Sequence, residues 1–211
     1  MKHVDETPTT SPFNWVTQRK HIPGEVGVWI FIGGDCLIFS IFFLTFMHYR
    51  GLDPELFNKS QGYLNQSYGL SNTALMLTSS WFVAMAVSAA RQLLTQYNKS
   101  KNDTSKVLRL MQGAQFCGIA FIALKYLEYS EKISTGISPV TNDFFTLYFM
   151  FTGIHLLHVV LGIGVITFLQ FHMKNKLITE SQLMHLESGA SFWHLVDLLW
   201  IVLFAILYVL R

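Results

Sequence analysis

The stretch from Val26 to Met47 reads VGVWIFIGGDCLIFSIFFLTFM, and Asp35 is its one charged residue. A helix needs about 20 mostly apolar residues to cross the hydrocarbon layer of a membrane, so this run is long enough. It also lacks the alternating pattern of a membrane β-barrel strand. The stretch therefore predicts a transmembrane helix and places the chain among the all-α membrane proteins.

Four further apolar stretches follow the first. The five predicted spans lie near residues 26–47, 73–94, 107–127, 144–171 and 189–210. We expect them to form one transmembrane domain over 25–211, preceded by a polar tail over 1–24. The connection over 51–72 carries Gly, Pro, Asn and Ser in turn-forming combinations. The sequence thus predicts a five-helix transmembrane bundle.

The overall composition excludes two classes of protein. Of the 211 residues only 13% are charged and the mean hydropathy is +0.37, whereas charged residues make up about 25% of an average chain. This shortage of charge excludes most soluble enzymes. A formal net charge of +2 is too small to indicate a nucleic-acid partner.

The basic residues divide unevenly between the two sides of the predicted bundle. Five of them fall on the side reached after the first and third spans and at the C-terminus: Arg50, Lys59, Lys125, Lys132 and Arg211. The other ten fall on the side of the N-terminal tail: Lys2, Arg19, Lys20, Arg91, Lys99, Lys101, Lys106, Arg109, Lys174 and Lys176. The positive-inside rule then predicts a cytoplasmic N-terminus and an outside C-terminus.

Asp35 lies near the middle of the first predicted span, with apolar residues and glycines for a turn on either side. An ionisable side chain at the bilayer centre costs roughly 2.5–3.5 kcal/mol, so it must face protein, water or a partner. Two interpretations follow. The carboxyl is a proton-linked or helix-locking group, or it is a neutral acid that forms a hydrogen bond with a neighbouring helix.

Histidines gather in the last two predicted spans. His155 and His158 are three residues apart, which places them on one helix face, and Gly153, Gly162 and Gly164 would let another backbone approach. In the next span a second pair, His194 and Asp197, has the same spacing. One hypothesis is a haem or metal site built from His155, His158 and His194. The alternative is an interhelical hydrogen-bond network, which we favour because no recognised metal-ligand spacing accompanies the histidines.

A charged cluster ends the third predicted span, in the run Leu124-Lys-Tyr-Leu-Glu-Tyr-Ser-Glu131. Lys125 and Glu128 are three residues apart on a helix and can form an ion pair. Because they lie near the end of the span, we expect a boundary cluster whose long side chains reach the membrane surface. We find no nucleotide-binding loop or nucleophile motif, so we expect no stand-alone catalytic site.

Five motifs, one within or at an end of each predicted span, together resemble one family. They are Trp29-Ile-Phe-Ile-Gly-Gly-Asp35, Asn72-Thr73, Glu128-Tyr129, His155-Leu-Leu-His158-Val-Val-Leu-Gly162 and Trp193-His-Leu-Val-Asp197-Leu-Leu-Trp200. In this order and spacing they resemble subunit III of the haem-copper oxidases, in its short five-helix form. The stretches Pro23 to Trp29, Leu77 to Ala84 and Thr141 to His155 are similar to the accessory protein of bacterial nitric oxide reductases. The Asp35-Cys36 pair also resembles the quinol-oxidase version of the subunit. The family's mitochondrial type has Glu where this chain has Asp35.

The resemblance implies an accessory subunit without a redox centre of its own. Haem and copper, or haem and non-haem iron, would belong to a catalytic partner subunit of an oxygen-reducing oxidase or a nitric oxide reductase. This chain would support the assembly, stability and sustained turnover of that partner and would contact membrane lipids. Two other functions remain open: a stand-alone haem-binding electron carrier that uses the histidines, and a proton-coupled transporter. An odd number of spans disfavours the transporter.

Overall fold

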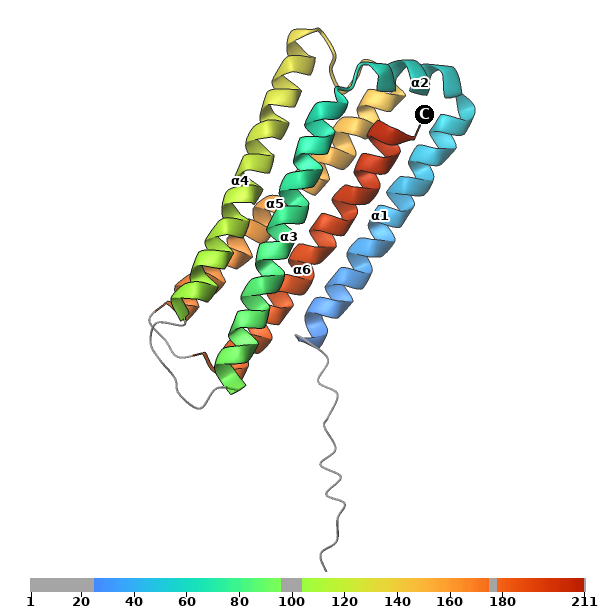
Figure 1. Cartoon of the computed structure of the whole chain (residues 1–211). Coiled ribbons are helices and arrows are strands. Elements are labelled where there is room, and N and C mark those ends of the chain that lie inside the picture. Colours follow the sequence, from blue (N-terminus) through green and yellow to red (C-terminus); the bar gives the residue numbers. More distant parts are fainter. Residues whose placement is uncertain (1–24, 96–103, 175–177, 211) are drawn as a thin grey trace, which may run out of the picture.

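The computed structural model describes residues 25–95, 104–174 and 178–210, and every regular element in these ranges is helical (Figure 1). The elements are α1 (Val26–Leu52), α2 (Pro54–Gly62), α3 (Gln66–Thr95), α4 (Thr104–Ser134), α5 (Asp143–Met173), α6 (Glu180–Phe204) and a terminal π-helical turn η1 (Ala205–Val209). Five of these helices are long and apolar enough to cross a membrane. The predicted all-α, five-span fold is confirmed, while the predicted tail lies outside the described residues.

Four helices form a closed ring, and the fifth packs against its outside. Helix α3 contacts α4 and α6, and α5 completes the ring by contacting the same two helices. Helix α1 lies against α5 and α6 (Figure 1). In its most apolar stretch only 11% of the residues are buried, against 56% in α6. The last helix is therefore the centre of the molecule, and the first is its periphery.

The connection over 51–72 is mostly helical, which corrects the prediction of a turn-rich loop. Helix α1 continues to Leu52, and α2 begins at once with Pro54 in its first turn. Asp53 caps this start, because its side chain accepts a hydrogen bond from the backbone N–H of Leu56 at 3.0 Å. A proline at the first helical position and an Asp at the N-cap both favour the start of a helix. Pro54, which the sequence suggested as a turn-forming residue, therefore begins a helix.

Three side chains satisfy the backbone carbonyls at the end of the last helix. The final carbonyls of a helix have no intrahelical donor and need one from elsewhere. Gln61 of α2 donates to Ile206 O at 3.0 Å, and Gln66 of α3 donates to Tyr208 O at 2.9 Å. Arg50 of α1 donates to Leu210 O at 2.7 Å. The C-terminal turn is thus tied to three earlier helices.

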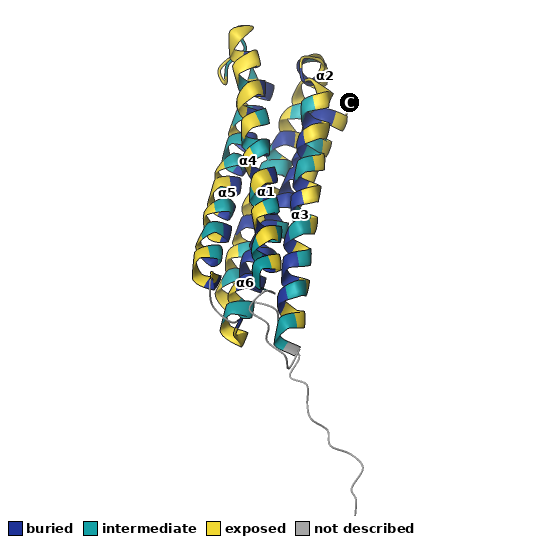
Figure 2. Ribbon diagram, turned by 60° about the vertical axis from the view of Figure 1, so that its left-hand side comes forward, coloured by how far each residue is buried: buried dark blue, intermediate teal, exposed yellow. Residues whose placement is uncertain are grey.

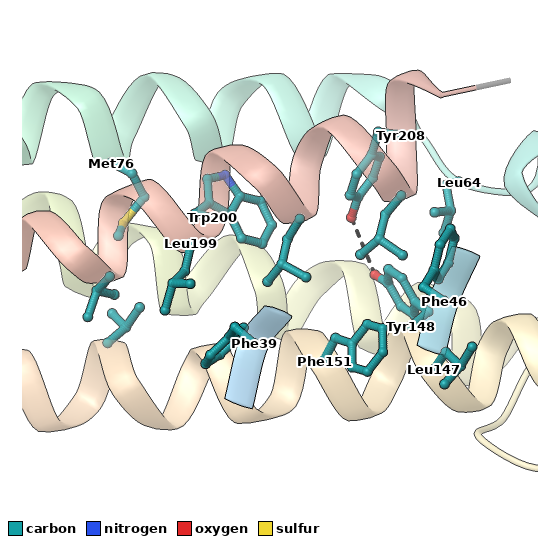
Figure 3. Packing of buried hydrophobic residues seen from close by; sticks show 14 of the residues in the cluster. Phe39, Phe46, Leu64, Met76, Leu147, Tyr148, Phe151, Leu199, Trp200 and Tyr208 are labelled. Carbon is teal, nitrogen blue, oxygen red and sulfur yellow. Dashed lines mark hydrogen bonds between the residues drawn. The ribbon is translucent and has the colours of Figure 1, made fainter. Parts of the chain in front are cut away.

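Buried apolar side chains form two clusters along the bundle. The cluster towards the C-terminal end is rich in aromatic rings, several of which converge between α1, α5 and α6 (Figure 3). The second cluster joins α3, α4, α5 and α6 towards the other end. Each long helix carries buried residues on one side and exposed residues on the other (Figure 2). Exposed apolar faces of this kind are suited to lipid or to a membrane partner.

Two helix glycines, Gly118 and Gly162, leave room for the buried side chain of Trp193. Its indole is fully buried, and a Cβ added at Gly162 would lie 2.7 Å from its Cε3 atom. A Cβ at Gly118 of α4 would lie 3.0 Å from its Cη2 atom. The glycines hence make room for a side chain, and not for the backbone approach that the sequence suggested. Gly153 and Gly164 face open space.

We predict that Gly162→Ala destabilises the bundle, because the buried indole cannot move away from the added methyl group. Overpacking of this kind costs about 1–3 kcal/mol. The measurement is the loss of folded protein on heating in detergent. Gly164→Ala, on the same helix but with nothing within 4 Å of the added atom, is the matched control and should leave the midpoint unchanged or slightly higher. Equal midpoints for the two variants would contradict the packing argument.

Candidate functional site

The six polar residues that the sequence singles out all lie at least partly inside the bundle, but in separate places. Glu128 and His155 are fully buried, and Asp35 and Asp197 are 8% and 3% exposed. Asp35 pairs with His158, while Asp197 lies beside His194. The six residues therefore divide among a cluster around Glu128, an isolated His155, and two His–Asp pairs.

The cluster around Glu128 is the most heavily bonded of these places. Lys125 donates to Glu128 Oε2 at 2.8 Å within α4. The other carboxylate oxygen, Oε1, accepts from the hydroxyl of Tyr148 on α5 at 2.8 Å and from that of Tyr208 on η1. Both charges are thereby satisfied by hydrogen bonds, as buried charges must be.

Aromatic rings enclose the ammonium group of Lys125. Its Nζ atom lies 4.8 Å from the ring centroid of Trp200 and 5.2 Å from that of Tyr148. It also donates to the hydroxyl of Tyr208 at 3.0 Å. An ammonium within about 6 Å of a ring centroid gains cation–π attraction, most of all where water is absent. Four chain segments meet around this one charge.

The expectation of a boundary cluster was wrong for Lys125 and Glu128, whereas the expected pairing between them is confirmed. Lys125 is only 1% exposed and Glu128 is not exposed at all. Helix α4 continues to Ser134, so the two residues lie well inside the helix and not at its end. Lys125 faces the bundle and does not extend towards the membrane surface.

Asp35 connects the peripheral helix to the ring. Its Oδ2 atom lies 3.4 Å from His158 Nε2 on α5, an ion-pair distance across two helices. His158 Nδ1 donates to the carbonyl of Ile154 at 2.8 Å, because a carbonyl can only accept. The other ring nitrogen of His158, Nε2, therefore faces the carboxyl group of Asp35 on α1. The pair anchors α1 in mid-membrane.

His155 stands among aromatic rings. It is not exposed, and its ring lies 5.6 Å from that of Phe121 and 5.3 Å from that of Trp200, centroid to centroid. Neither ring nitrogen has a hydrogen-bond partner among the described residues. His158, one turn further along, contacts α1 and not these rings. His155 and His158 thus have different neighbours: His155 packs against rings of α4 and α6, whereas His158 packs against α1 and Phe192 of α6.

His194 lies at the seam between α6 and α3. Its Nδ1 atom is 2.7 Å from Ser80 Oγ and 3.8 Å from Asp197 Oδ2. The side chain of His194 is 41% exposed, while that of Asp197 is 5% exposed. Both carboxylate oxygens of Asp197 are buried without a hydrogen bond among the described residues. Asp197 is thus paired with His194 at an ion-pair distance only.

The three histidines do not converge on one point. His155 packs between rings of α4 and α6, His158 faces Asp35, and His194 faces Ser80. A metal shell needs three or four ligands around one position. Within 25–95, 104–174 and 178–210, no group of three or more His, Cys, Asp or Glu side chains is placed to hold an ion. The geometry favours interhelical contacts over the haem or metal hypothesis.

Sequence reasoning missed the partners that complete these places. Tyr148, Tyr208 and Trp200 were not singled out as partners of the Lys125–Glu128 pair, because they lie on helices far apart in the chain. The Arg91 Nε atom, 2.8 Å from Glu187 Oε1, joins α3 to α6 in the same way. A lysine and a glutamate three apart on one helix were the available signal, but their partners on other helices require the tertiary structure.

We predict that Lys125→Met destabilises the chain by about 3–5 kcal/mol, because removing one partner leaves the carboxylate of Glu128 buried without its counter-charge. The double variant Lys125→Met with Glu128→Gln removes both charges and should recover part of the loss. The free energy of unfolding is measured by titrating the detergent-solubilised chain with a denaturing detergent.

The matched control is Lys106→Met, which makes the same substitution at an exposed position of α4. It should leave the free energy of unfolding within about 0.5 kcal/mol of the parent. A Lys125→Met chain as stable as Lys106→Met would show that the buried ion pair adds nothing to the fold.

Comparison with known proteins supports the resemblance. The family model for cytochrome c oxidase subunit III matches residues 17–211. Subunit 3 of the cytochrome bo(3) ubiquinol oxidase of Buchnera aphidicola subsp. Schizaphis graminum is 26% identical over 183 residues, which cover 86% of this chain and 91% of that protein. Quinol oxidase subunit 3 of Bacillus subtilis is 23% identical over 216 residues, covering 100% of this chain and 98% of that protein. The chain, a multi-pass inner-membrane protein, belongs to the cytochrome c oxidase subunit III family.

Proposed function

We propose that this chain is a non-redox accessory subunit of a bacterial respiratory haem-copper oxidoreductase. One observation carries the proposal beyond family membership: the charged side chains deep in the spans are engaged by other side chains of the chain itself. Lys125 pairs with Glu128, and Asp35 pairs with His158. The second of these pairs joins α1 to α5, and Glu128 also accepts hydrogen bonds from Tyr148 on α5 and Tyr208 on η1, so these contacts hold helices together as a scaffold requires.

The partner in this proposal is the haem-containing catalytic subunit. Haem and copper, or haem and non-haem iron, are held there, and membrane lipids cover the remaining apolar surface. The partner reduces oxygen or nitric oxide. In the same proposal, the N-terminus of this chain lies in the cytoplasm. A membrane scaffold acts on such a partner by stabilising its assembled state, because whatever binds only the folded complex shifts the equilibrium towards it.

We predict that deleting this chain slows the respiratory complex and shortens its active lifetime without abolishing electron transfer. The catalytic subunit keeps its own redox centres, so the haem spectrum of the remaining complex should be retained. Oxygen and nitric oxide consumption by membranes of the deletion strain, followed through many turnovers, are the measurements. The gas whose consumption falls identifies the reaction of the partner.

Complementation with the parent chain is the control and should restore the rate and the lifetime. Complete loss of activity in the presence of intact, haem-loaded catalytic subunit would contradict an accessory role. The same conclusion would follow if no haem-containing membrane subunit co-purified with the tagged chain.

We predict that the chain purified apart from its partner shows no haem Soret band in its absorption spectrum. The physical reason is that His155, His158 and His194 contact different neighbours and present no common axial position. Reconstitution with added haem is the control for loss during purification. A stoichiometric Soret band that disappears in the His155→Ala or His194→Ala variant would favour the electron-carrier function instead.

A further inference from the structure

A cavity of about 720 Å³ opens at the end of the bundle where α2, the end of α4 and the start of α5 meet (Figure 1). Its volume lies within the range of small-molecule sites, about 300–1,000 Å³. The rest of its lining comes from the α4–α5 connection and the helix turns on either side of it. Four residues at helical spacing form the wall that α2 contributes: Leu56, Lys59, Ser60 and Tyr63. We call this space the α2–α4–α5 cavity.

Lys132 of α4 lines the cavity and carries a buried charge without a counter-charge. The residue is 5% exposed, and its Nζ atom donates to the backbone carbonyl of Tyr63 at the end of α2. No carboxylate of the described residues lies within ion-pair distance of this Nζ atom. An ammonium group has three N–H donors, so one neutral carbonyl leaves two of them without an acceptor. A buried charge of this kind needs a partner of opposite sign.

Lys125, seven residues earlier on α4, shows how the bundle satisfies a buried ammonium from within. It pairs with Glu128, donates to the hydroxyl of Tyr208 and faces aromatic rings. In the part of the chain that the structure describes, Lys132 has neither a carboxylate nor a ring at such distances. The contrast indicates that the charge on Lys132 is met by an anion that enters the cavity.

Two groups of α2 add to the positive and donating character of the cavity. Lys59 is exposed and has no carboxylate of the described residues within ion-pair distance. Ser60 is 3% exposed, and its Oγ atom accepts from Asn142 Nδ2 at 3.0 Å, so its own O–H is left without an acceptor among the described residues. Glu131 is the one acid among the described lining residues, against two lysines, and it is exposed. The lining therefore offers ammonium and hydroxyl donors to an anion.

The depth of the cavity narrows the kind of anion. Helix α4 ends at Ser134, two residues after Lys132, and α5 begins at Asp143, so the cavity lies at the ends of two spans. The phosphate groups of lipids lie at this level, just outside the hydrocarbon core. Leu56 and Phe145 add an apolar part to the lining. A phosphate has several acceptor oxygens, which suit donors from two helices, and lysine is a common phosphate-binding residue.

We propose that the α2–α4–α5 cavity is a binding site for a phosphate-bearing anion, with the ammonium group of Lys132 as its buried contact and that of Lys59 as its exposed contact. The phosphate comes either from the head group of an anionic phospholipid or from free inorganic phosphate, because the same donors serve both. The site lies beyond the proposed function and does not require a catalytic partner.

The first test measures binding to the purified full-length chain in neutral detergent. Native mass spectrometry follows a titration with phosphatidylglycerol, whose only charge is its phosphate. We expect tighter binding than that of phosphatidylcholine, because the lysines repel the choline cation. Binding of phosphatidylglycerol that inorganic phosphate does not displace assigns the site to a lipid. A thermal midpoint that rises with inorganic phosphate, and not with phosphatidylglycerol or with sodium chloride of equal ionic strength, assigns it to the free anion.

The second test changes the two lysines. Lys132→Gln should weaken the binding of the effective probe about tenfold or more, the effect of losing a charge-assisted hydrogen bond at a buried position. Lys59→Gln should weaken it about two- to fivefold, since solvent screens an exposed charge. The matched control is Lys106→Gln, which removes an exposed lysine at the other end of α4 and should bind like the parent chain.

Lys132 also caps the end of α2 through Tyr63, so the thermal midpoint of each variant is measured without ligand. If Lys132→Gln does not fold, Lys59→Glu provides the test, because it changes only an exposed position of α2. It should lose more affinity than Lys59→Gln, since it replaces attraction by repulsion.

The outcomes separate a phosphate site from a purely structural lysine. Binding of either probe that depends on Lys132 and Lys59, but not on Lys106, supports the site. Equal losses for all three variants would show non-specific attraction and overturn it. A Lys132→Gln chain with a lower midpoint but the parent affinity for both probes would assign Lys132 to the capping of α2 and would also overturn it. The proposed function is decided separately, by whether a catalytic subunit co-purifies.

Discussion

The bundle depends on one compensated charge. Lys125 lies in the low-dielectric interior, where an unpaired ammonium would cost several kcal/mol. Its charge is met by Glu128, whose second oxygen is in turn met by Tyr148 and Tyr208. These groups come from α4, α5 and the end of the chain, so Glu128 makes all of these hydrogen bonds only when α5 and the C-terminal turn pack against α4. This requirement fixes the position of the C-terminal turn.

Different kinds of contact hold the helices together at the two ends of the bundle. Towards the C-terminal end, aromatic rings and hydrogen bonds join α1, α5 and α6 around the charged cluster (Figure 3). Towards the other end, Trp193 fills the space left by Gly118 and Gly162. Because lipid tails are as apolar as the side chains, close packing and hydrogen bonds hold membrane helices together better than hydrophobicity does. Both close packing and hydrogen bonds are found at the contacts between these helices.

Sequence reasoning predicted the helices better than their contacts. The apolar runs gave five spans because the thickness of the bilayer sets their length, and the structure extends each with polar turns. Asp35 and Asp197 both lie inside the bundle, where an acid avoids the cost of exposure to lipid. Lys125 was misplaced, because its depth depends on where α4 ends and on rings from other helices. Spacing within one helix cannot supply that information.

By itself, the sequence determined the class of the protein, its five membrane spans and the family to which it belongs. Those follow from local apolar length and from motifs that are read along the chain. The tertiary structure alone decided that His155 and His158 pack against different side chains, and that Lys125 is enclosed while His194 is half exposed. The physical reason is that the burial of a helix residue depends on which neighbour packs against its face, and the neighbours come from distant parts of the chain.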